Sequence, residues 1–204
     1  LGDVYKRQIL LGKVNPSGKL NVSFPRSTGN TPCFYNHFVI DREESFDQPG
    51  TPEEPKGHYI FDKPEPLWNF GHGKSYTTFD YVDCALSDTL LVASDTLKVS
   101  VTIKNTGRRD GKEVVQLYVR DKVSTVATPI QQLKAFQKVL IKPGESQCVE
   151  LSLPIAELAL YNAKMEEVVE PGDFEIQIGA ASDDIRFKKT ITTVSYTHLR
   201  AHET

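Results

Sequence analysis

Apolar and polar residues alternate through much of the second half of the chain. In LKVSVTIKN and EVVQLYVRD, every second residue is apolar. The alternating positions are Leu97, Val99, Val101, Ile103, Val115, Leu117 and Val119. A period of two residues is typical of a β-strand that buries one face and exposes the other. Both segments are therefore predicted to be half-buried strands.

Further segments with strand character follow, and turn residues separate them. The strands are KAFQKVLI, CVELSL, FEIQIG and IRFKKTITT; the turns are NTGRRDGK, KPGES and EPGD. PIAELALYN is expected to form a short helical crossover. About seven short strands with a turn every eight to twelve residues are typical of an antiparallel β-sandwich. One-sided alternation also argues against a parallel sheet covered on both faces. We therefore predict a mainly β protein with this sandwich at residues 79–193.

The first part of the chain has a different pattern. ILLG is typical of the last turn of a helix, NPSGK of a turn, and LNVSF of a short strand. Residues 39–78 contain DREESFDQPGTPEEPKG, which is acidic, rich in proline and poor in apolar residues. Such a segment is expected to be an irregular surface loop or linker.

Composition excludes several classes of function. Hydrophobic residues make up 39% of the 204 and charged residues 25%, as in soluble globular proteins, and the net charge is −3. No basic field is present to attract nucleic acid or anionic lipid. No apolar run reaches the roughly 18 residues of a membrane span, and no signal peptide opens the chain. We expect no nucleic-acid or membrane partner.

The cysteines give no sign of a metal site or a disulfide framework. Cys33, Cys84 and Cys148 are odd in number and far apart, and no Cys-x-x-Cys or Cys/His cluster occurs. We expect buried free thiols, no metal and no cofactor.

Several motifs, taken in order, resemble the family 3 glycoside hydrolases. They are GKVNPSGKLNVSFPRS, the YNH at 35–37, PLWNFGHGKSYTTFDY, KNTGRRDGKEVVQLYVRD and VEPGDFEIQIGAAS. The match is similar to the C-terminal end of a bacterial β-glucosidase or β-xylosidase and covers nearly all of residues 9–193. Asn21, His72 and Lys74 stand where the family usually has Pro, Tyr and Leu.

This resemblance implies a domain plan. In the family, a (β/α)8 barrel carries an aspartate nucleophile, and an α/β sandwich domain supplies the acid/base glutamate. A fibronectin type III-like (immunoglobulin-like) β-sandwich follows. Residues 9–38 are then the tail of the α/β sandwich domain, residues 39–78 a linker, and residues 79–193 the fibronectin-like domain.

The resemblance also implies that no catalytic residue lies in this chain, because both carboxylates belong upstream of Ile9. The acidic residues of the loop are expected to be solvated, so no role is transferred to them; they are Asp41, Glu43, Glu44, Glu53 and Glu54. The full enzyme is expected to hydrolyse terminal β-linked glucose or xylose, while this chain alone should be inactive. Its partner would be an oligosaccharide, reached through the missing catalytic domains. Family habit favours the periplasm or secretion, and the oligomeric state stays open.

Two histidines and four aromatic residues are candidate site residues. His37 and His58 flank the acidic loop, where they are candidates for substrate contact or for a structural hydrogen-bonding role. The aromatic residues expected to pack between domains are Trp68, Phe70, Tyr76 and Phe79. Trp68 is also a candidate platform for stacking a sugar ring. The glycines of FGHGKS suit a backbone turn and lack the spacing of a phosphate loop.

The two ends of the chain have a feature that no natural gene requires. Codons for residues 194–204 can be written to contain the reverse complement of nearly all the codons for residues 1–8. That DNA resembles the transposon-derived adaptor of sequencing libraries. Leu1–Gln8 and Val194–Thr204 are therefore interpreted as translated adaptor without a function. Nucleotides unrelated to those strings would contradict this interpretation.

A different class of function is a stand-alone carbohydrate-binding or adhesion module, since β-sandwiches host many functions. Two features argue against it. Residues 9–38 make sense as the remainder of a larger sheet, and no strand shows a row of aromatic residues. Without upstream partners, this segment should leave apolar side chains short of contacts; these are Leu10, Leu11, Leu20, Val22 and Phe24.

Overall fold

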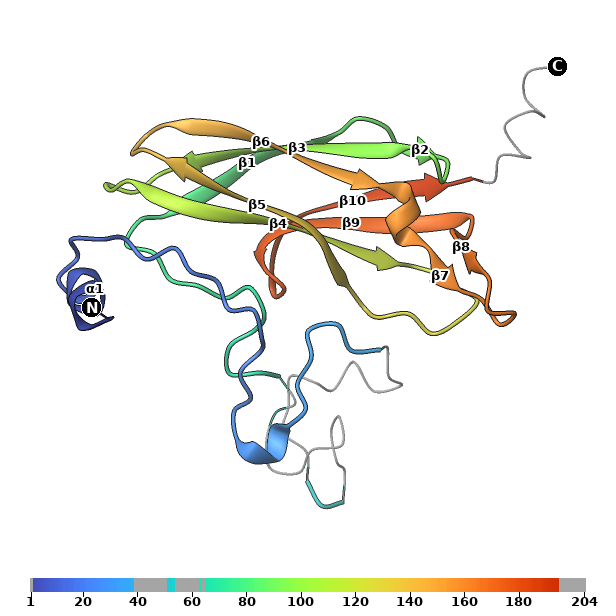
Figure 1. Cartoon of the computed structure of the whole chain (residues 1–204), viewed down its shortest axis with the longest axis horizontal. Coiled ribbons are helices and arrows are strands. Elements are labelled where there is room, and N and C mark those ends of the chain that lie inside the picture. Colours follow the sequence, from blue (N-terminus) through green and yellow to red (C-terminus); the bar gives the residue numbers. More distant parts are fainter. Residues whose placement is uncertain (1, 39–50, 54–62, 64, 195–204) are drawn as a thin grey trace.

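The computed structural model describes residues 2–38, 51–53, 63 and 65–194 (Figure 1). His58 and the acidic residues Asp41, Glu43, Glu44 and Glu54 lie outside the described residues. Glu53 is described and is exposed. Most of the described chain forms two β-sheets that face one another, and residues 2–38 lie to one side of them (Figure 1).

The sandwich consists of a three-stranded and a five-stranded sheet. The smaller sheet has the order β1 (Phe79–Leu86), β3 (Thr96–Asn105), β6 (Ser146–Pro154). The larger sheet has the order β2 (Leu90–Leu91), β10 (Asp184–Thr193), β9 (Gly172–Ala181), β4 (Gly111–Asp121), β5 (Gln132–Ile141). A further small sheet pairs β7 (Leu160–Tyr161) with β8 (Glu167–Val168). Neighbouring strands pair antiparallel apart from β2 and β10, which pair parallel over two residues.

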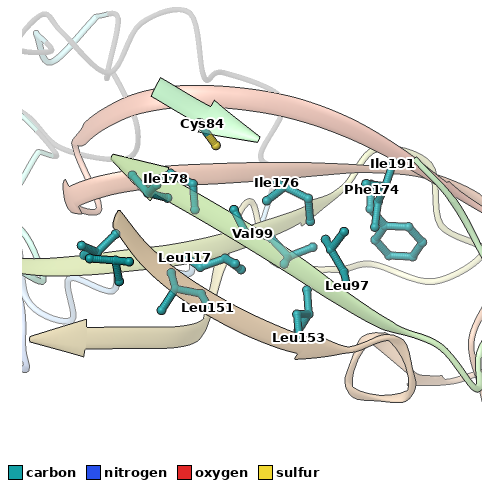
Figure 2. Close-up of a cluster of buried hydrophobic side chains, with 14 of the residues drawn as sticks. Cys84, Leu97, Val99, Leu117, Leu151, Leu153, Phe174, Ile176, Ile178 and Ile191 are labelled. Atoms are coloured by element: carbon teal, nitrogen blue, oxygen red, sulfur yellow. The ribbon is translucent and has the colours of Figure 1, made fainter. Parts of the chain in front are cut away.

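The core fills the space between the two sheets. Figure 2 shows side chains from both sheets pointing into this space, among them Val99, Leu117, Leu151 and Ile176. The four are 0–3% exposed. Burying a Val, Leu or Ile side chain contributes about 1.5–3 kcal/mol, so the alternating positions that are predicted to face inward hold the sandwich together.

The predicted fold class, an antiparallel β-sandwich, is confirmed. Among the described residues, seven strands are eight to eleven residues long, and the first of them begins at Phe79. The alternation in LKVSVTIKN and EVVQLYVRD matches the burial of β3 and β4. The expected crossover is a single 3-10 turn, η3 (Ile155–Leu158), followed at once by β7.

The expectation that all three thiols are buried is wrong. Cys84 is buried and Cys33 half-buried, but Cys148 is exposed, and all three are free. The reason is the strand period: Val149 and Leu151 face the core from β6, so Cys148 faces solvent. Burial raises the pKa of the Cys84 thiol and of the Cys33 thiol.

The segment before the sandwich contains little regular structure. Helix α1 (Gly2–Leu10) ends where ILLG predicts, and η1 (Thr28–Asn30) is one 3-10 turn. Gly12 has φ +68° and closes the helix: its N–H donates to the Ile9 carbonyl, and the Lys13 N–H donates to the Gln8 carbonyl. This pair of bonds satisfies carbonyls at the helix end and requires a residue that tolerates the left-handed region.

LNVSF does not form the regular strand that its alternation predicts. The Leu20 N–H donates to the His72 carbonyl, and the Phe24 N–H donates to the Trp68 carbonyl. Between these contacts Val22 is exposed and has no sheet and no core to pack against. Alternation with a period of two therefore predicts a strand correctly at residues 97–103 but not at residues 20–24. Tertiary packing decides whether an alternating segment becomes a strand of a sheet.

Candidate functional site

The described structure brings the motif segments together at a junction between residues 9–38 and the sandwich. Asn15 of NPSGK is the centre of this junction. Its Oδ1 accepts hydrogen bonds from Ser75 Oγ at 3.0 Å and from the Tyr76 backbone N–H at 2.8 Å. Its Nδ2 donates to the Asp110 carbonyl at 2.9 Å. One turn side chain thus joins FGHGKSY to NTGRRDGK.

Tyr76 and Arg109 form a second contact across the junction. Tyr76 Oη donates to the Ile9 carbonyl at 2.9 Å, and Arg109 donates to the Gly12 carbonyl. The Arg109 guanidinium also lies 6.0 Å from the centroid of the Tyr76 ring, near the limit of a cation–π contact. The end of α1 is therefore attached to the sandwich through its last carbonyls.

The junction also contains an ion pair. Lys19 Nζ is 2.9 Å from Glu113 Oε1, and their side chains are 18% and 9% exposed. The Val114 N–H donates to the same carboxylate oxygen at 2.9 Å. Gly73 lets the two backbones approach, because a Cβ there would stand 2.4 Å from the Gly18 carbonyl oxygen. A carboxylate held by a lysine and an amide in this way is structural.

Three aromatic rings pack together on the outer face of the larger sheet. Tyr35 stacks on Phe70 with centroids 4.1 Å apart, and its edge meets Tyr118 at 5.9 Å. Tyr118 is 0% exposed although it alternates with the inward residues of β4. Its hydroxyl donates to Gln116 Oε1 at 2.5 Å, and Gln116 Nε2 donates to the Ala180 carbonyl at 2.6 Å. Burial raises the pKa of the Tyr118 hydroxyl.

The structure places each expected aromatic contact residue at or near this junction. Trp68 meets Phe24 edge to face, with centroids 5.9 Å apart, and is 46% exposed. Phe70 stacks on Tyr35, and the Phe70 carbonyl accepts the Ser182 N–H. Phe79 packs against the sandwich core beside Gly111. A role of these residues in packing whole domains together remains a prediction.

His37 lies at another part of the molecule. Its Nδ1 is 3.0 Å from the Phe38 carbonyl oxygen, and its own carbonyl accepts the Ile130 N–H. Phe38 pairs with Pro129, so the segment is attached to the loop between β4 and β5. His58 lies outside the described residues, so the structure does not bring the two histidines together. Their contact with substrate stays a prediction.

Sequence reasoning missed Tyr35, Gln116 and Tyr118 as junction residues. The YNH motif contained Tyr35, but a sandwich strand with a solvent-facing side gave no reason to bury Tyr118. A useful signal was the polar-aromatic pair Gln116 and Tyr118 on the face of β4 opposite Val115 and Leu117.

The residues before the sandwich expose many large apolar side chains. Nine of them are Leu10, Leu11, Val14, Val22, Phe24, Phe34, Leu67, Trp68 and Tyr76, with exposed fractions from 43% to 81%. In the following text these nine residues are called the apolar face. Four of the five residues expected to lack contacts belong to it; Leu20 is half-buried.

Within the described ranges, no group of three His, Cys, Asp or Glu side chains is arranged to hold a metal ion. The helices of that part of the chain are too short or too polar to cross a membrane.

Comparison with known proteins agrees with this arrangement. Residues 113–182 match the fibronectin type III-like domain. A β-xylosidase of Formosa agariphila is 41% identical over 180 residues, which cover 87% of this chain and 24% of the relative. The periplasmic β-glucosidase of Salmonella typhimurium is 38% identical over 87% of this chain and 23% of its own length.

Solved structures show the same likeness. The crystal structure of a β-glucosidase from Listeria innocua in complex with glucose superposes with a TM-score of 0.80 at 36% identity. The superposition covers 93% of this chain and 26% of that one. The chain thus spans about a quarter of the length of these relatives. It belongs to the family 3 glycoside hydrolases and corresponds to the part of those enzymes that includes the fibronectin type III-like domain.

Proposed function

We propose that this chain is the C-terminal portion of a retaining β-glycosidase and that its own role is structural. The whole enzyme would hydrolyse terminal β-linked glucose or xylose from oligosaccharides. The sandwich would brace the catalytic domains, and residues 9–38 would complete the α/β domain beside it. The observation that carries this proposal is the apolar face, because it lies on the residues that precede a sandwich whose own core is well buried.

Exposed apolar side chains in such number support an interaction surface. Monomeric proteins rarely expose large contiguous apolar patches, and such patches mark places where another surface binds. The relatives have about three quarters of their length outside the region matched here. The occupant we propose for the apolar face is therefore the remainder of the same enzyme.

The junction supports the same role. Asn15, Tyr76 and the Lys19–Glu113 pair fix the end of the N-terminal segment to the sandwich. A domain that braces another needs such a fixed connection, because relative motion is the default for domains joined by small interfaces. Trp68 and Tyr76 would extend this contact to the catalytic domains.

We propose no catalytic residue in this chain. Retaining hydrolysis requires two carboxyl groups about 5–5.5 Å apart on either side of the scissile bond. Glu113 is a buried carboxylate at the junction, but it is paired with Lys19 and with a backbone amide. The chain alone would therefore not hydrolyse glycosides. A periplasmic or secreted location is proposed from the Salmonella relative, which is named as periplasmic.

A chimera tests this proposal. Residues 9–193 would replace the matching quarter of the Formosa agariphila β-xylosidase, and hydrolysis of an aryl β-xyloside would be measured. We expect activity from the chimera and none from the 204-residue chain alone. Leu10→Lys in the chimera should lower its yield and activity, because Leu10 is 81% exposed on the apolar face.

Met165→Lys is the matched control, because Met165 is 78% exposed in the turn between β7 and β8. It should leave the chimera unchanged. Hydrolysis by the chain alone would refute the structural role. Equal effects of the two substitutions would show that the apolar face does not meet the rest of the enzyme.

A further inference from the structure

The loop between β4 and β5 encloses a hollow that the junction does not use. Its cavity volume is about 170 Å³. At about 30 Å³ for each water molecule, this is room for about six waters, or for a single sugar ring. Its walls include Phe38, Arg120, Asp121 and Ser124, and Pro129 lies between it and a second hollow of about 60 Å³.

The hollow is held in shape by hydrogen bonds on several sides. The Lys122 N–H donates to the Asp173 carbonyl, and Lys122 Nζ donates to Thr190 Oγ1 at 2.9 Å. The Thr125 N–H donates to Glu170 Oε2 at 2.9 Å. The Ile130 N–H donates to the His37 carbonyl, which holds Phe38 against the loop. A site that is formed before the ligand arrives loses less entropy on binding.

Two charged side chains of the hollow, Arg120 and Asp121, make few contacts with the rest of the described chain. Arg120 is half-buried and takes part in no ion pair among the residues that the structure describes. Asp121 lines both hollows, and its Oδ1 accepts one hydrogen bond, from the Val123 N–H at 3.2 Å. Partial burial raises the pKa of the Asp121 carboxyl. Phe38 adds a ring that is 54% exposed.

We propose that this hollow binds one sugar residue of a β-linked saccharide. Arg120 and Asp121 both line the hollow, so the guanidinium can donate to sugar hydroxyl groups and the carboxylate can accept from them. The Phe38 ring covers the apolar C–H face of a pyranose. The opposite charges of Arg120 and Asp121 favour a neutral polar ligand over a simple anion or cation. The choice of saccharide as ligand rests on the proposed function, but the site does not require catalysis.

The test is a titration of the isotope-labelled 204-residue chain with xylobiose and with cellobiose, followed by amide chemical shifts. We expect saturable shifts at residues 120–130 with a dissociation constant of about 1 mM, which corresponds to about −4 kcal/mol. Arg120→Gln, Asp121→Ala and Phe38→Ala should each weaken binding about tenfold, which is about 1.4 kcal/mol.

Each variant has a control outside the hollow. Arg108→Gln, Asp80→Ala and Phe136→Ala remove exposed residues of the same types, and Phe136 is 67% exposed on β5. These controls should bind as the parent chain does. Circular dichroism and thermal unfolding would confirm that every compared variant is folded.

Three outcomes would overturn the proposal. They are the absence of saturable shifts at 50-fold excess over about 1 mM, equal loss of binding in variants and controls, and shifts that inorganic phosphate reproduces while the disaccharides do not. If binding is absent but the β-xylosidase chimera is active, the sugar site fails and the proposed function stands. If binding occurs but the chimera is inactive, the proposed function fails and the site stands.

Discussion

The two regions of this molecule differ in where their apolar side chains lie. In the sandwich, Leu97, Val101 and Leu117 are 0% exposed between two sheets. In the segment before it, Leu10 and Leu11 are 81% and 64% exposed. Both regions contain large apolar side chains, so the difference is one of partners. A sheet that pairs with a second sheet supplies its own core, whereas a helix end and an extended segment need a surface from elsewhere.

The largest expected effect compares two leucines. Leu117→Ala should cost about 2–5 kcal/mol, because it removes buried methyl groups and leaves a cavity in the core. Leu11→Ala should change the free energy of unfolding by less than about 0.5 kcal/mol, because that side chain is mostly in water already. Urea unfolding of both variants measures the difference. Similar costs would mean that the segment has a core of its own.

A smaller effect is expected at the junction. Asn15→Ala removes three hydrogen bonds and should release the segment from the sandwich by local opening. Amide hydrogen exchange should become about 10- to 30-fold faster at Leu20, whose N–H donates to the His72 carbonyl, and stay unchanged at Val101 in β3. Asn21→Ala, at an exposed position of the same segment, is the control. Equal acceleration at Leu20 and Val101 would show that both regions unfold as one unit.

The smallest expected effect concerns Asp121, a partly buried carboxyl group of the sandwich. The pKa of Asp121 is raised in the folded state, chiefly by burial, so the folded state holds this proton more tightly than the unfolded chain does. Its contribution to stability is therefore present at low pH and is lost as pH rises above about 3.9 and through the folded-state pKa.

Asp121→Asn keeps an oxygen for the Val123 N–H but removes the charge. The variant should unfold at an equal or slightly higher temperature than the parent at pH 7, with a difference that shrinks at pH 3. Thermal unfolding at the two pH values measures this. A variant that is less stable than the parent at pH 7 and equal at pH 3 would show that the ionised carboxylate is stabilising.

Sequence patterns predicted the sandwich well, because the alternation of apolar and polar residues within a strand indicates which of its side chains face the core. The alternation in LKVSVTIKN appears unchanged as the burial pattern of β3. The expected burial of Cys148 is wrong, although the alternation of Val149 and Leu151 on the same strand indicates its exposure. The same rule fails for LNVSF, where no second sheet covers the alternating residues. Periodicity predicts which side chains can be buried, but a partner surface decides whether they are.

The candidate site was less predictable. Trp68, Phe70, Tyr76 and Phe79 were expected at an interface from motif resemblance, and the structure places them at or near the junction with residues 9–38. The hollow beside Asp121 had no sequence signal, because its walls come from Phe38 and from a loop more than eighty residues later.

The sequence by itself determined the strands, the turns and the family resemblance, because period two, turn residues and ordered motifs are local properties of the chain. Only the tertiary structure decided that Asn15 joins two distant turns, that Tyr118 is buried on an outward face, and that Arg120 and Asp121 share a hollow with Phe38. The physical reason is that contacts between segments distant in sequence depend on how the sheets fold over one another, which no local pattern specifies.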